Sequence, residues 1–561
     1  MGVFQNPVFE YVRSPDQDAP APMRHAVAVV GAGPVGLAAA IDLAQHGLPT
    51  VLLDDDSTVS VGSRSVCYAK RTLEILDRLG CGERVARRGV GWNAGRVYFQ
   101  DIQVYSFTLM PEPGNRRPAF VNLQQYYLEE ILLEQARATG KVDLRWKSRV
   151  VDLRQDGPGV ALRIETPDGA YGIVCDWVVV CDGARSPLRQ MMGLECRGEV
   201  IRDRFLIADV LMDADYPVER WFWFDPPFHP NHSALLHRQA DNVWRIDLQL
   251  GWDTDPDEER RPERVVPRLR QMLGDREFEL LWVGVYSFAC RRMERFRHGR
   301  VLFAGDAAHQ MSPFGARGTN SGIQDADNLG WKLAMVASGM APVELLDSYS
   351  DERVAAADEN LLHAARSTEF ITPKSRMSRT FRDAVLLLAR SYPFARRMVN
   401  SGRLSVPAVL RDSALNTADA DLFAGPMTPG APAADAPVVV NGELRWLLEC
   451  LGNRFNGMYF ANGMSVLPGE VAAGIASLTL DRIPVETRVV VEPGNPIELP
   501  PGVMKLEDYE DLAAQRYDAG PGTFYLLRPD QHVCARWRAF DAQRARQAVL
   551  RATCNEPGRS D

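Results

Sequence analysis

The chain has 561 residues, which predicts about three to four domains at about 150 residues per domain. Apolar residues make up 46% of it and charged residues 24%, so a disordered chain, a collagen-like fibre and a disulfide-dense miniprotein are excluded. The formal net charge is −9, and because an acidic surface repels phosphates, we expect no nucleic-acid partner.

The cysteines and the N-terminal segment indicate the cellular compartment of the protein. Nine cysteines are scattered without a Cys-x-x-Cys pair or zinc-like spacing, which predicts reduced thiols and no metal site. Residues 1–20 are polar and interrupted by proline, unlike a signal peptide. No apolar run approaches the roughly 18 residues that would indicate a membrane span. We therefore expect a cytoplasmic protein that does not associate with membranes.

The folded part is predicted to begin with a β-α-β unit. Residues 25–30 form a short apolar strand, residues 35–46 an alanine-rich helix, and residues 49–53 a second strand. Such a unit implies a parallel sheet. Two more helices are predicted, at 70–79 and 125–139.

The middle of the chain changes character twice. Residues 142–181 alternate apolar and polar side chains between Gly- and Pro-containing turns, which predicts a β-meander ending in a buried strand at 177–181. Residues 205–290 are rich in tryptophan and strand-like, which predicts an inserted antiparallel domain, joined by a segment near 90–120. A strand at 300–304 then returns to the first domain.

Helices dominate the next part, and a boundary follows. A long helix is predicted at 321–338, and the helical pattern continues to about 400. Residues 426–437 are rich in proline and alanine and are interpreted as a linker. The remainder is predicted to contain strands at about 456–461, 487–491 and 523–527 and a final helix at 540–552.

These elements predict an α/β and α+β protein with a Rossmann-like first domain. The expected units are 24–204 and 291–425 for that domain, 205–290 for the inserted antiparallel sheet, 426–437 for the linker and 438–561 for a C-terminal domain.

The first motif that carries chemistry is Gly31-Ala-Gly33-Pro-Val-Gly36, between the first strand and the first helix. Its glycines allow a tight turn, a close approach of a pyrophosphate and close packing of helix on strand. Asp54 ends the next strand, where a carboxylate can accept hydrogen bonds from a ribose. Acid at this position argues against a 2′-phosphate on the nucleotide.

Two further motifs also follow strands directly. Asp182-Gly183 comes after the apolar strand at 177–181, and Gly305-Asp306 comes after the strand at 300–304. The loop from Pro313 to Asn320 then leads into the long helix, and its backbone N–H groups can stabilise negative charge. His309 is a candidate general base, but a histidine held in the Gly-Asp turn is the favoured interpretation.

In this order and spacing the three motifs resemble the class A FAD-dependent aromatic hydroxylases, flavoprotein monooxygenases of the phenol and 3-(3-hydroxyphenyl)propionate hydroxylase type. The resemblance covers about residues 24–400. It extends more weakly to the C-terminal part, which resembles a thioredoxin-like domain without Cys-x-x-Cys. That part is expected to be structural and to serve dimerisation, so a homodimer is predicted.

The resemblance implies roles for individual residues. Asp182, Gly183 and Arg189 match a motif that serves FAD and the nicotinamide cofactor, and Pro313 matches a proline beside the flavin ring. The residues implied to bind FAD are Gly31, Gly33, Pro34, Val35, Gly36, Asp54, Arg64, Gln125, Asp182, Gly183, Gly305, Asp306, Gly318, Thr319 and Asn320.

The chain departs from the family at two places. Asp54-Asp55 stands where the family often has Glu-Arg, and Gly315-Ala316-Arg317-Gly318 replaces the common Gly-Gln-Gly pattern. Arg317 is therefore a candidate catalytic residue that either binds an acidic or phenolate substrate or neutralises the flavin or a nearby carboxylate.

Candidate substrate residues come from the inserted domain. Trp221 and Trp223 share one face of a predicted strand and could form the wall of a substrate pocket, although a role in the core of the sheet is slightly favoured. His232 and His237 are candidate bases for a phenol, with a structural or exposed position as the favoured alternative.

The resemblance implies that NADH or NADPH reduces FAD, and that O₂ then forms a flavin C4a-hydroperoxide. This species hydroxylates a phenolic ring, in the degradation of an aromatic compound. Three alternatives stay open: a polyketide hydroxylase or epoxidase of antibiotic biosynthesis, a reductase of isoprenoid lipids, and a non-catalytic FAD-binding scaffold. A wide pocket behind residues 205–250 would favour the polyketide, and a small closed cavity near Arg317 a monocyclic phenol.

Overall fold

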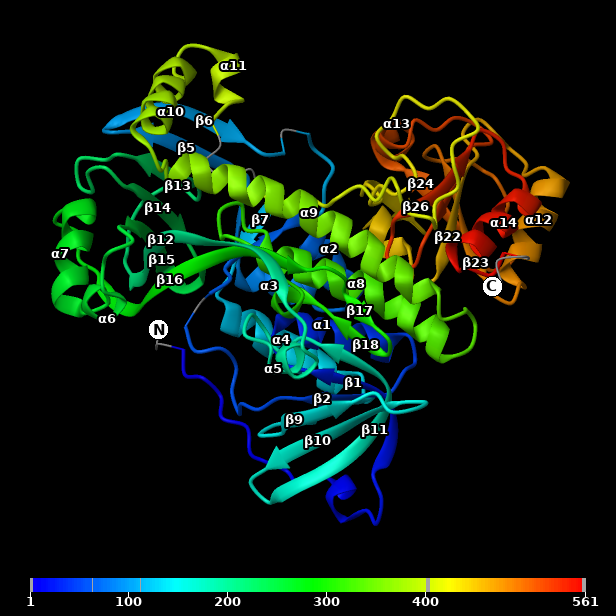
Figure 1. The fold of residues 1–561 in the computed structure, drawn as a ribbon. Helices are drawn as coiled ribbons and strands as arrows, with labels where there is room; N and C mark the ends of the chain where they lie inside the picture. Colours follow the sequence, from blue (N-terminus) through cyan, green and yellow to red (C-terminus); the bar gives the residue numbers. More distant parts are fainter. Residues whose placement is uncertain (1–3, 63, 111, 400–403, 557–561) are drawn as a thin grey trace.

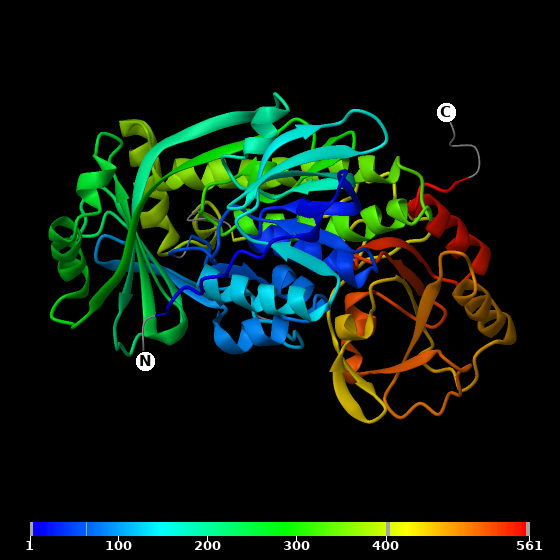
Figure 2. The same ribbon diagram turned by 90° about the horizontal axis from the view of Figure 1, so that it is seen from below.

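The structure is a computed structural model that describes residues 4–62, 64–110, 112–399 and 404–556. It contains a central part built on a parallel sheet, a long antiparallel sheet at one end and a separate C-terminal unit at the other (Figures 1 and 2). Helix α9, Leu345–Ile371, runs across the central part between the two ends.

The parallel sheet has the strand order β17-β18-β11-β1-β2-β8. All neighbouring pairs are parallel except the short edge pair β17–β18. The strands are β1 Met23–Val30, β2 Thr50–Leu53, β8 Val142–Arg145, β11 Gly169–Val180, β17 Arg297–His298 and β18 Val301–Phe303. The prediction of a Rossmann-like sheet at the start of the chain is confirmed.

The meander predicted at 142–181 is correct only in its second part. β8 pairs in parallel with β2, whereas β9 Arg149–Arg154, β10 Val160–Thr166 and the first half of β11 form the antiparallel meander. The second half of β11 lies between β1 and β18. Alternating polarity could not reveal this change of partner, because it reports which face is buried and not which strand lies alongside.

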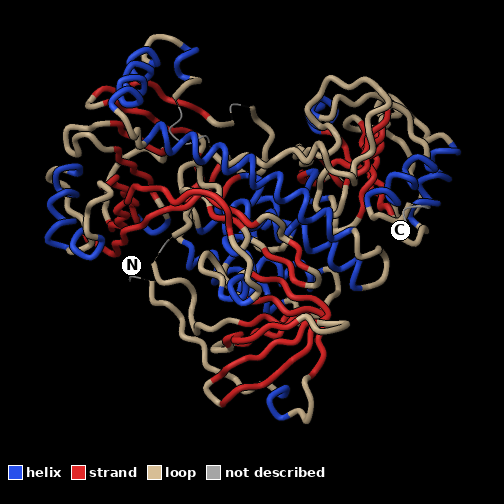
Figure 3. The backbone as a smooth tube through the Cα atoms, in the orientation of Figure 1, coloured by secondary structure: helices blue, strands red, loops and turns tan. Residues whose placement is uncertain are grey.

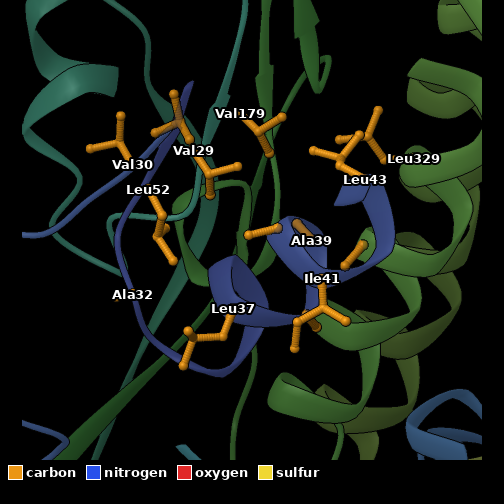
Figure 4. Close-up of a cluster of buried hydrophobic side chains, with 14 of the residues drawn as sticks. Val29, Val30, Ala32, Leu37, Ala39, Ile41, Leu43, Leu52, Val179 and Leu329 are labelled. Atoms are coloured by element: carbon orange, nitrogen blue, oxygen red, sulfur yellow. The ribbon is translucent and has the colours of Figure 1, made fainter. Parts of the chain in front are cut away.

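Helix α1, Pro34–Gln45, packs between the parallel sheet and helix α8, Gly318–Ala337. Figure 4 shows Leu43 of α1 beside Leu329 of α8. The alanines of α1 are buried and let the helices approach closely, so the loops that precede both helices lie at one edge of the sheet. Helix α8 begins three residues before the predicted start at 321.

The remaining helices and a small sheet surround this core. Strands β3 Cys67–Ala69, β7 Phe120–Asn122 and β4 Val90–Trp92 form a three-stranded sheet. The helices that have not yet been given are α2 Lys70–Arg78, α3 Gly82–Arg88, α4 Gln125–Ala138, α5 Pro187–Met191, α6 Pro256–Glu259, α7 Pro262–Leu273, α10 Arg376–Ala389 and α11 Pro393–Arg396.

The second large sheet has the order β19-β16-β12-β15-β14-β13-β5-β6. Its strands, red in Figure 3, are antiparallel except for the pair β5–β13. They are β5 Ala94–Phe99, β6 Ile102–Thr108, β12 Cys196–Leu211, β13 Arg220–Phe224, β14 Ser233–Arg238, β15 Val243–Leu250, β16 Glu279–Met293 and β19 His309–Gln310. Helix α7 packs against one face, and the other face is turned toward the parallel sheet.

The C-terminal unit contains a seven-stranded mixed sheet in the order β21-β20-β24-β23-β22-β25-β26. Its strands β22 and β23 are parallel, and β25 and β26 continue the sheet antiparallel to β22, which is the strand order of a thioredoxin-like fold. The elements are β20 Pro437–Val440, β21 Glu443–Trp446, β22 Phe455–Phe460, α12 Gly469–Thr479, β23 Val485–Val491, β24 Met504–Asp508, α13 Leu512–Arg516, β25 Phe524–Leu527, β26 Val533–Trp537 and α14 Ala542–Ala552.

Residues 426–437, which were predicted to form a linker, pack into the C-terminal unit. Met427, Ala433 and Ala436 are buried in the core of the C-terminal unit, and Pro432 forms a β-bridge with His532. Small apolar residues occur both in tightly packed cores and in linkers, so composition alone could not distinguish a buried segment from a linker. In the same unit, burial raises the pKa of the Cys450 thiol to about 11 and of the Cys534 thiol to about 12, which leaves little reactive thiolate.

Over the described ranges, no helix combines the length and apolarity needed to cross a membrane.

Candidate functional site

A cavity of about 670 Å³ lies between the parallel sheet and the antiparallel sheet. One wall consists of the loops at the carboxyl ends of the parallel strands, where open α/β sheets bind ligands. The other wall is the inner face of β12–β16. Of the residues expected to bind FAD, the cavity is lined by Gly31, Gly33, Pro34, Val35, Asp54, Arg64, Gln125, Asp182, Gly183, Asp306, Gly318 and Thr319.

The glycine loop at the start of α1 is shaped to receive a phosphate. Gly31 has a φ of +103°, and a side chain at Gly36 would overlap the carbonyl oxygen of Gly31. By contrast, a Cβ at Gly33 would meet no heavy atom within 4 Å, so this position faces open space at the helix N-terminus. The free N–H groups of the first turn of α1 can therefore bind an anion there.

Asp54 lies beside this loop at the end of β2. Its Oδ2 accepts a hydrogen bond from the N–H of Ala32 at 2.5 Å, and its Oδ1 accepts one from Asp56 at 2.8 Å. Burial raises the pKa of Asp54 to about 6, so the carboxylate is ionised at neutral pH. Each oxygen keeps a second lone pair, which leaves Asp54 able to bind a ribose hydroxyl.

The Asp182-Gly183 turn is held to the Gly305-Asp306 turn by Arg189. Arg189 donates hydrogen bonds to the carbonyl oxygens of Ala307 at 2.6 Å and Ala184 at 3.0 Å. It does not line the cavity, so the structure gives it a bracing position rather than the contact with cofactor that the resemblance implied. Burial raises the pKa of Asp182, whose Oδ1 is buried without a hydrogen-bond partner among the described residues.

His309 is held inside the protein. It is fully buried, and its Nε2 lies 2.7 Å from Oδ2 of Asp325. Asp325 also accepts hydrogen bonds from the N–H of Gly305 at 3.0 Å and from Nε of Arg353 at 2.7 Å. The histidine therefore supports the Gly305-Asp306 turn, as the favoured interpretation of the sequence has it.

We expect the substitution Asp325→Asn to weaken FAD binding about tenfold, a change of about 1.4 kcal/mol, because the amide can no longer accept all three hydrogen bonds that fix the turn. The measurement is titration of the apoprotein with FAD, followed by flavin fluorescence. Asp358→Asn is the matched control, because Asp358 lies on α9 with an exposed side chain paired to Arg292. Equal FAD affinity in D325N and the wild type would contradict this role.

The loop that precedes α8 forms the side of the cavity next to the antiparallel sheet. Pro313, Arg317, Gly318 and Thr319 line it. Arg317 is almost fully buried and donates a hydrogen bond to Oδ1 of Asn360 at 2.6 Å. The N-terminus of α8 thus points its first N–H groups at the cavity, where they would favour negative charge.

Asn320 does not take the position expected from the resemblance. Its amide bonds to the N–H of Ala69 and the carbonyl oxygens of Cys67 and Ala316, and it does not line the cavity. These backbone bonds use up most of its hydrogen-bonding capacity, so it joins the loop to β3 instead of facing a ligand.

Gln125 is tied to the segment that also carries Arg64. Its Oε1 accepts from the N–H of Ser65 at 3.0 Å, and its Nε2 donates to Ser60 and to Glu129. Arg64 and Gln125 both line the cavity, and the charge of Arg64 acts on Asp306 of the Gly-Asp turn.

The inner face of the antiparallel sheet carries a row of polar side chains. Register places Arg220 of β13, His237 of β14, Arg245 of β15 and Asp209 of β12 side by side across four neighbouring strands. Nε of Arg245 lies 2.9 Å from Oδ1 of Asp209. Asp247 stands two residues after Arg245, on the same face.

Trp221 and Trp223, for which the core of the sheet was slightly favoured over the wall of a substrate pocket, do not line this cavity. They pack on the opposite face with Tyr98 and Tyr216, while Arg220 and Phe222 face inward. His232 lies in an exposed turn against His229, and only His237 of the two candidate histidines lines the cavity. The sequence correctly predicted which side chains share a face of this strand. Which face lines the cavity depends on how the sheet packs.

Sequence reasoning missed Arg220, Arg245 and Asp247. A usable signal was the segment Val243–Leu250, in which Arg245, Asp247 and Gln249 alternate with the buried apolar residues Trp244, Ile246 and Leu248. Charged residues on one face of an internal strand indicate a polar cavity, because a buried charge needs partners.

The residues present fit FAD. The glycine loop leaves space for a pyrophosphate at a helix N-terminus, Asp54 stands within the same cavity, and Asp182 keeps a buried oxygen that lacks a partner in the described chain. These features define a dinucleotide-binding flavoprotein with a substrate cavity between two sheets.

Comparison with known proteins agrees with this class. The family profile described as "FAD binding domain" matches residues 24–364. A 3-(3-hydroxy-phenyl)propionate/3-hydroxycinnamic acid hydroxylase of Mycolicibacterium smegmatis is 27% identical over 537 residues, covering 92% of this chain and 91% of the relative. Aklavinone 12-hydroxylase RdmE of Streptomyces purpurascens is 29% identical over 564 residues, covering 94% and 98%.

Among solved structures, the flavin-dependent monooxygenase PieE, in complex with FAD and substrate, is similar with a TM-score of 0.77 at 23% identity, covering 96% of this chain and 100% of that chain. The chain therefore belongs to the FAD-binding family of class A flavoprotein aromatic hydroxylases. It is an FAD-dependent monooxygenase, which confirms the predicted enzyme class and cofactor, and the structural likeness confirms the predicted fold class.

Proposed function

We propose that the protein hydroxylates a monocyclic phenol, with NADH or NADPH and O₂ as co-substrates, in the degradation of an aromatic compound. The observation that supports this best is the polar inner wall, where Arg220, His237, Arg245 and Asp247 face the loops that would hold the flavin. Buried charges on a wall favour a substrate with polar substituents over a large apolar one.

The two walls of the cavity would have different roles, one in holding the cofactor and one in orienting the substrate. When bound in the cavity, FAD supplies electrons taken from the nicotinamide and the activation of O₂. The glycine loop and Asp54 would hold its phosphates and ribose, while Pro313, Gly318 and Thr319 would orient the ring. The inner face of the antiparallel sheet would orient the substrate and exclude water from the reacting atoms.

The test uses the purified holoenzyme and a panel of phenols that carry carboxylate, alkyl or nitro substituents. NADH and NADPH oxidation is recorded with and without each phenol, and the products are analysed by mass spectrometry. We expect at least one monocyclic phenol to accelerate oxidation and to gain one oxygen atom. If only polycyclic phenols do so, the monocyclic assignment fails.

A polycyclic substrate is the second candidate, and a specific feature favours it. A second cavity of about 640 Å³ lies further along the same sheet face, lined by Asp209, Leu211, Tyr126 and Trp282. Arg245 lines the first cavity and its partner Asp209 the second, so their ion pair stands between the two cavities. If this ion pair opens, a longer molecule can extend from the first cavity into the second.

We expect the double substitution Asp209→Ala and Arg245→Ala to join the two cavities and to raise activity on tricyclic and tetracyclic phenols about tenfold relative to monocyclic ones. Removing both partners avoids leaving one buried charge unpaired. The matched control is Arg96→Ala with Glu219→Ala, an ion pair of the same sheet that lines neither cavity. If the ratio of activity on polycyclic phenols to activity on monocyclic ones does not change, the ion pair does not separate the two cavities.

A further inference from the structure

Asp247 is an unusual residue in the wall of the cavity. It lies on β15 between Ile207 of β12 and Leu235 of β14, in a row that is otherwise apolar. Its side chain is half-buried and lines the cavity, as Pro313 of the loop before α8 also does. No described residue forms a hydrogen bond to it, and its Oδ1 is shielded from solvent without a partner.

His237, the histidine in the same wall, is poorly suited to accept a proton. Oδ1 of Asn122 accepts a hydrogen bond from Nε1 of Trp92 at 2.7 Å, so Nδ2 of Asn122 is the donor that faces Nδ1 of His237 at 3.3 Å. Since Nδ1 then accepts, the ring proton lies on Nε2. Burial and the guanidinium groups of Arg220 and Arg245 hold the pKa of His237 well below its usual range.

We propose that Asp247 is the general base that removes the proton from the ring hydroxyl group of the substrate, a role that rests on the proposed function. A carboxylate that lines the cavity and has no hydrogen-bond partner in the described chain is available for a hydroxyl group of a ligand. No other carboxylate of β12–β16 lines this cavity, since Asp209 is paired with Arg245 and lines the second one.

The step is a proton transfer without a change of oxidation state. The O–H bond of the phenol breaks, its electron pair stays on the substrate oxygen, and the proton forms an O–H bond with the carboxylate of Asp247. The negative charge moves from the aspartate to the substrate oxygen, which activates the ring toward an electrophilic oxygen. Asp247 later returns the proton to the product oxygen.

The surrounding charges suit such a transfer. Burial raises the pKa of Asp247, Arg245 of β15 and Arg220 of β13 lower it, and Asp209 of β12 raises it. His237 of β14 is neutral, and the thiol of Cys67 on β3 stays uncharged because burial raises its pKa to about 11. Before and after the transfer, the two arginines face one negative charge at nearly the same place, so both states are stabilised. Burial has the largest effect and brings the pKa of Asp247 to about 6, close to the range in which a general base works best.

The decisive experiment compares Asp247→Asn with the wild-type holoenzyme on two phenols of different acidity. With an unactivated phenol, kcat/KM of the wild type should rise with pH through about 6, whereas D247N should be slower at pH 7 by a factor of about 10² to 10⁴. The rate of D247N should recover with rising pH as the phenol itself ionises. With 4-nitrophenol, which is already ionised near neutral pH, the loss should be within about threefold, because no base is needed.

Binding gives a readout that does not depend on turnover. The Kd of the unactivated phenol for the oxidised holoenzyme, followed by flavin absorbance, should depend on pH near 6 in the wild type and not in D247N. Asp247→Glu should restore part of the rate. Asp253→Asn is the matched control, because Asp253 is an exposed aspartate shortly after the same strand and should keep the wild-type profile.

The outcomes separate the two proposals. If the wild type hydroxylates no phenol, the proposed function fails. Two results would overturn the role of Asp247 as base, provided that the wild type hydroxylates phenols. In the first, D247N is as fast as the wild type with the unactivated phenol at pH 7. In the second, kcat/KM of D247N falls by the same factor with both phenols.

Discussion

Replacing Gly33 with valine is expected to weaken FAD binding at least about 100-fold, or about 3 kcal/mol, while the fold survives. The backbone at Gly33 has a φ of −73°, which valine adopts, and a Cβ there would meet no heavy atom within 4 Å. The new side chain would therefore fill only the space in which the pyrophosphate is expected. We expect the free energy of unfolding to fall by about 1 kcal/mol, because valine is a poor N-cap.

The measurement is the FAD content of the purified variant, together with its thermal unfolding as apoprotein. Gly469→Val is the matched control, because Gly469 also stands at the start of a helix and faces open space, but in the C-terminal unit. It should bind FAD like the wild type. Gly36→Ala should disturb both fold and binding, because its Cβ would overlap Gly31. Full FAD content in G33V would show that the phosphate does not sit at this loop.

The second large effect is expected at a buried ion cluster that joins α8 and α9 to the C-terminal unit. Glu352 of α9 accepts hydrogen bonds from Arg528 at 2.6 and 3.0 Å and from Lys332 of α8 at 2.7 Å. Arg528 also pairs with Asp530, and all four side chains are at most 2% exposed.

The substitution Arg528→Met should lower the free energy of unfolding by about 3–5 kcal/mol, because Glu352 and Asp530 would remain buried with too few counter-charges. Denaturant unfolding of the apoprotein measures this. Arg197→Met is the control, since Arg197 and its partner Glu294 are 80% and 69% exposed, and a surface pair contributes at most about 1 kcal/mol. A loss below about 1 kcal/mol in R528M would refute the importance of the cluster.

The same cluster predicts a sensitivity to acid. Burial by itself raises the pKa of Glu352, but the charges of Arg528 and Lys332 outweigh it and hold the pKa well below its usual range. Because the folded-state pKa is lowered, the stabilisation is complete above the ordinary glutamate pKa of 4.5 and is lost as the pH falls below it. Glu352→Gln should therefore be less stable than the wild type at pH 7, and the difference should shrink in acid.

The helices and strands next to the motifs followed closely from the sequence. The first β-α-β unit, the helix at 70–79 and the strand at 300–304 lie within a few residues of their predicted ends, because local periodicity and glycine punctuation determine them. The buried segment at 426–437 and the parallel pairing of β8 were missed, because both depend on contacts with residues far away in the sequence.

The candidate site divides in the same way. The sequence by itself predicted most of the residues that line the side of the cavity proposed to hold FAD, since each motif is a short contiguous segment whose position after a strand already sets its place at one edge of a parallel sheet. Only the tertiary structure decided the substrate half. Arg220, His237, Arg245 and Asp247 meet through lateral pairing of β13, β14 and β15. The packing of α7 on the other face of the sheet turns these residues, and not Trp221 and Trp223, toward the cavity.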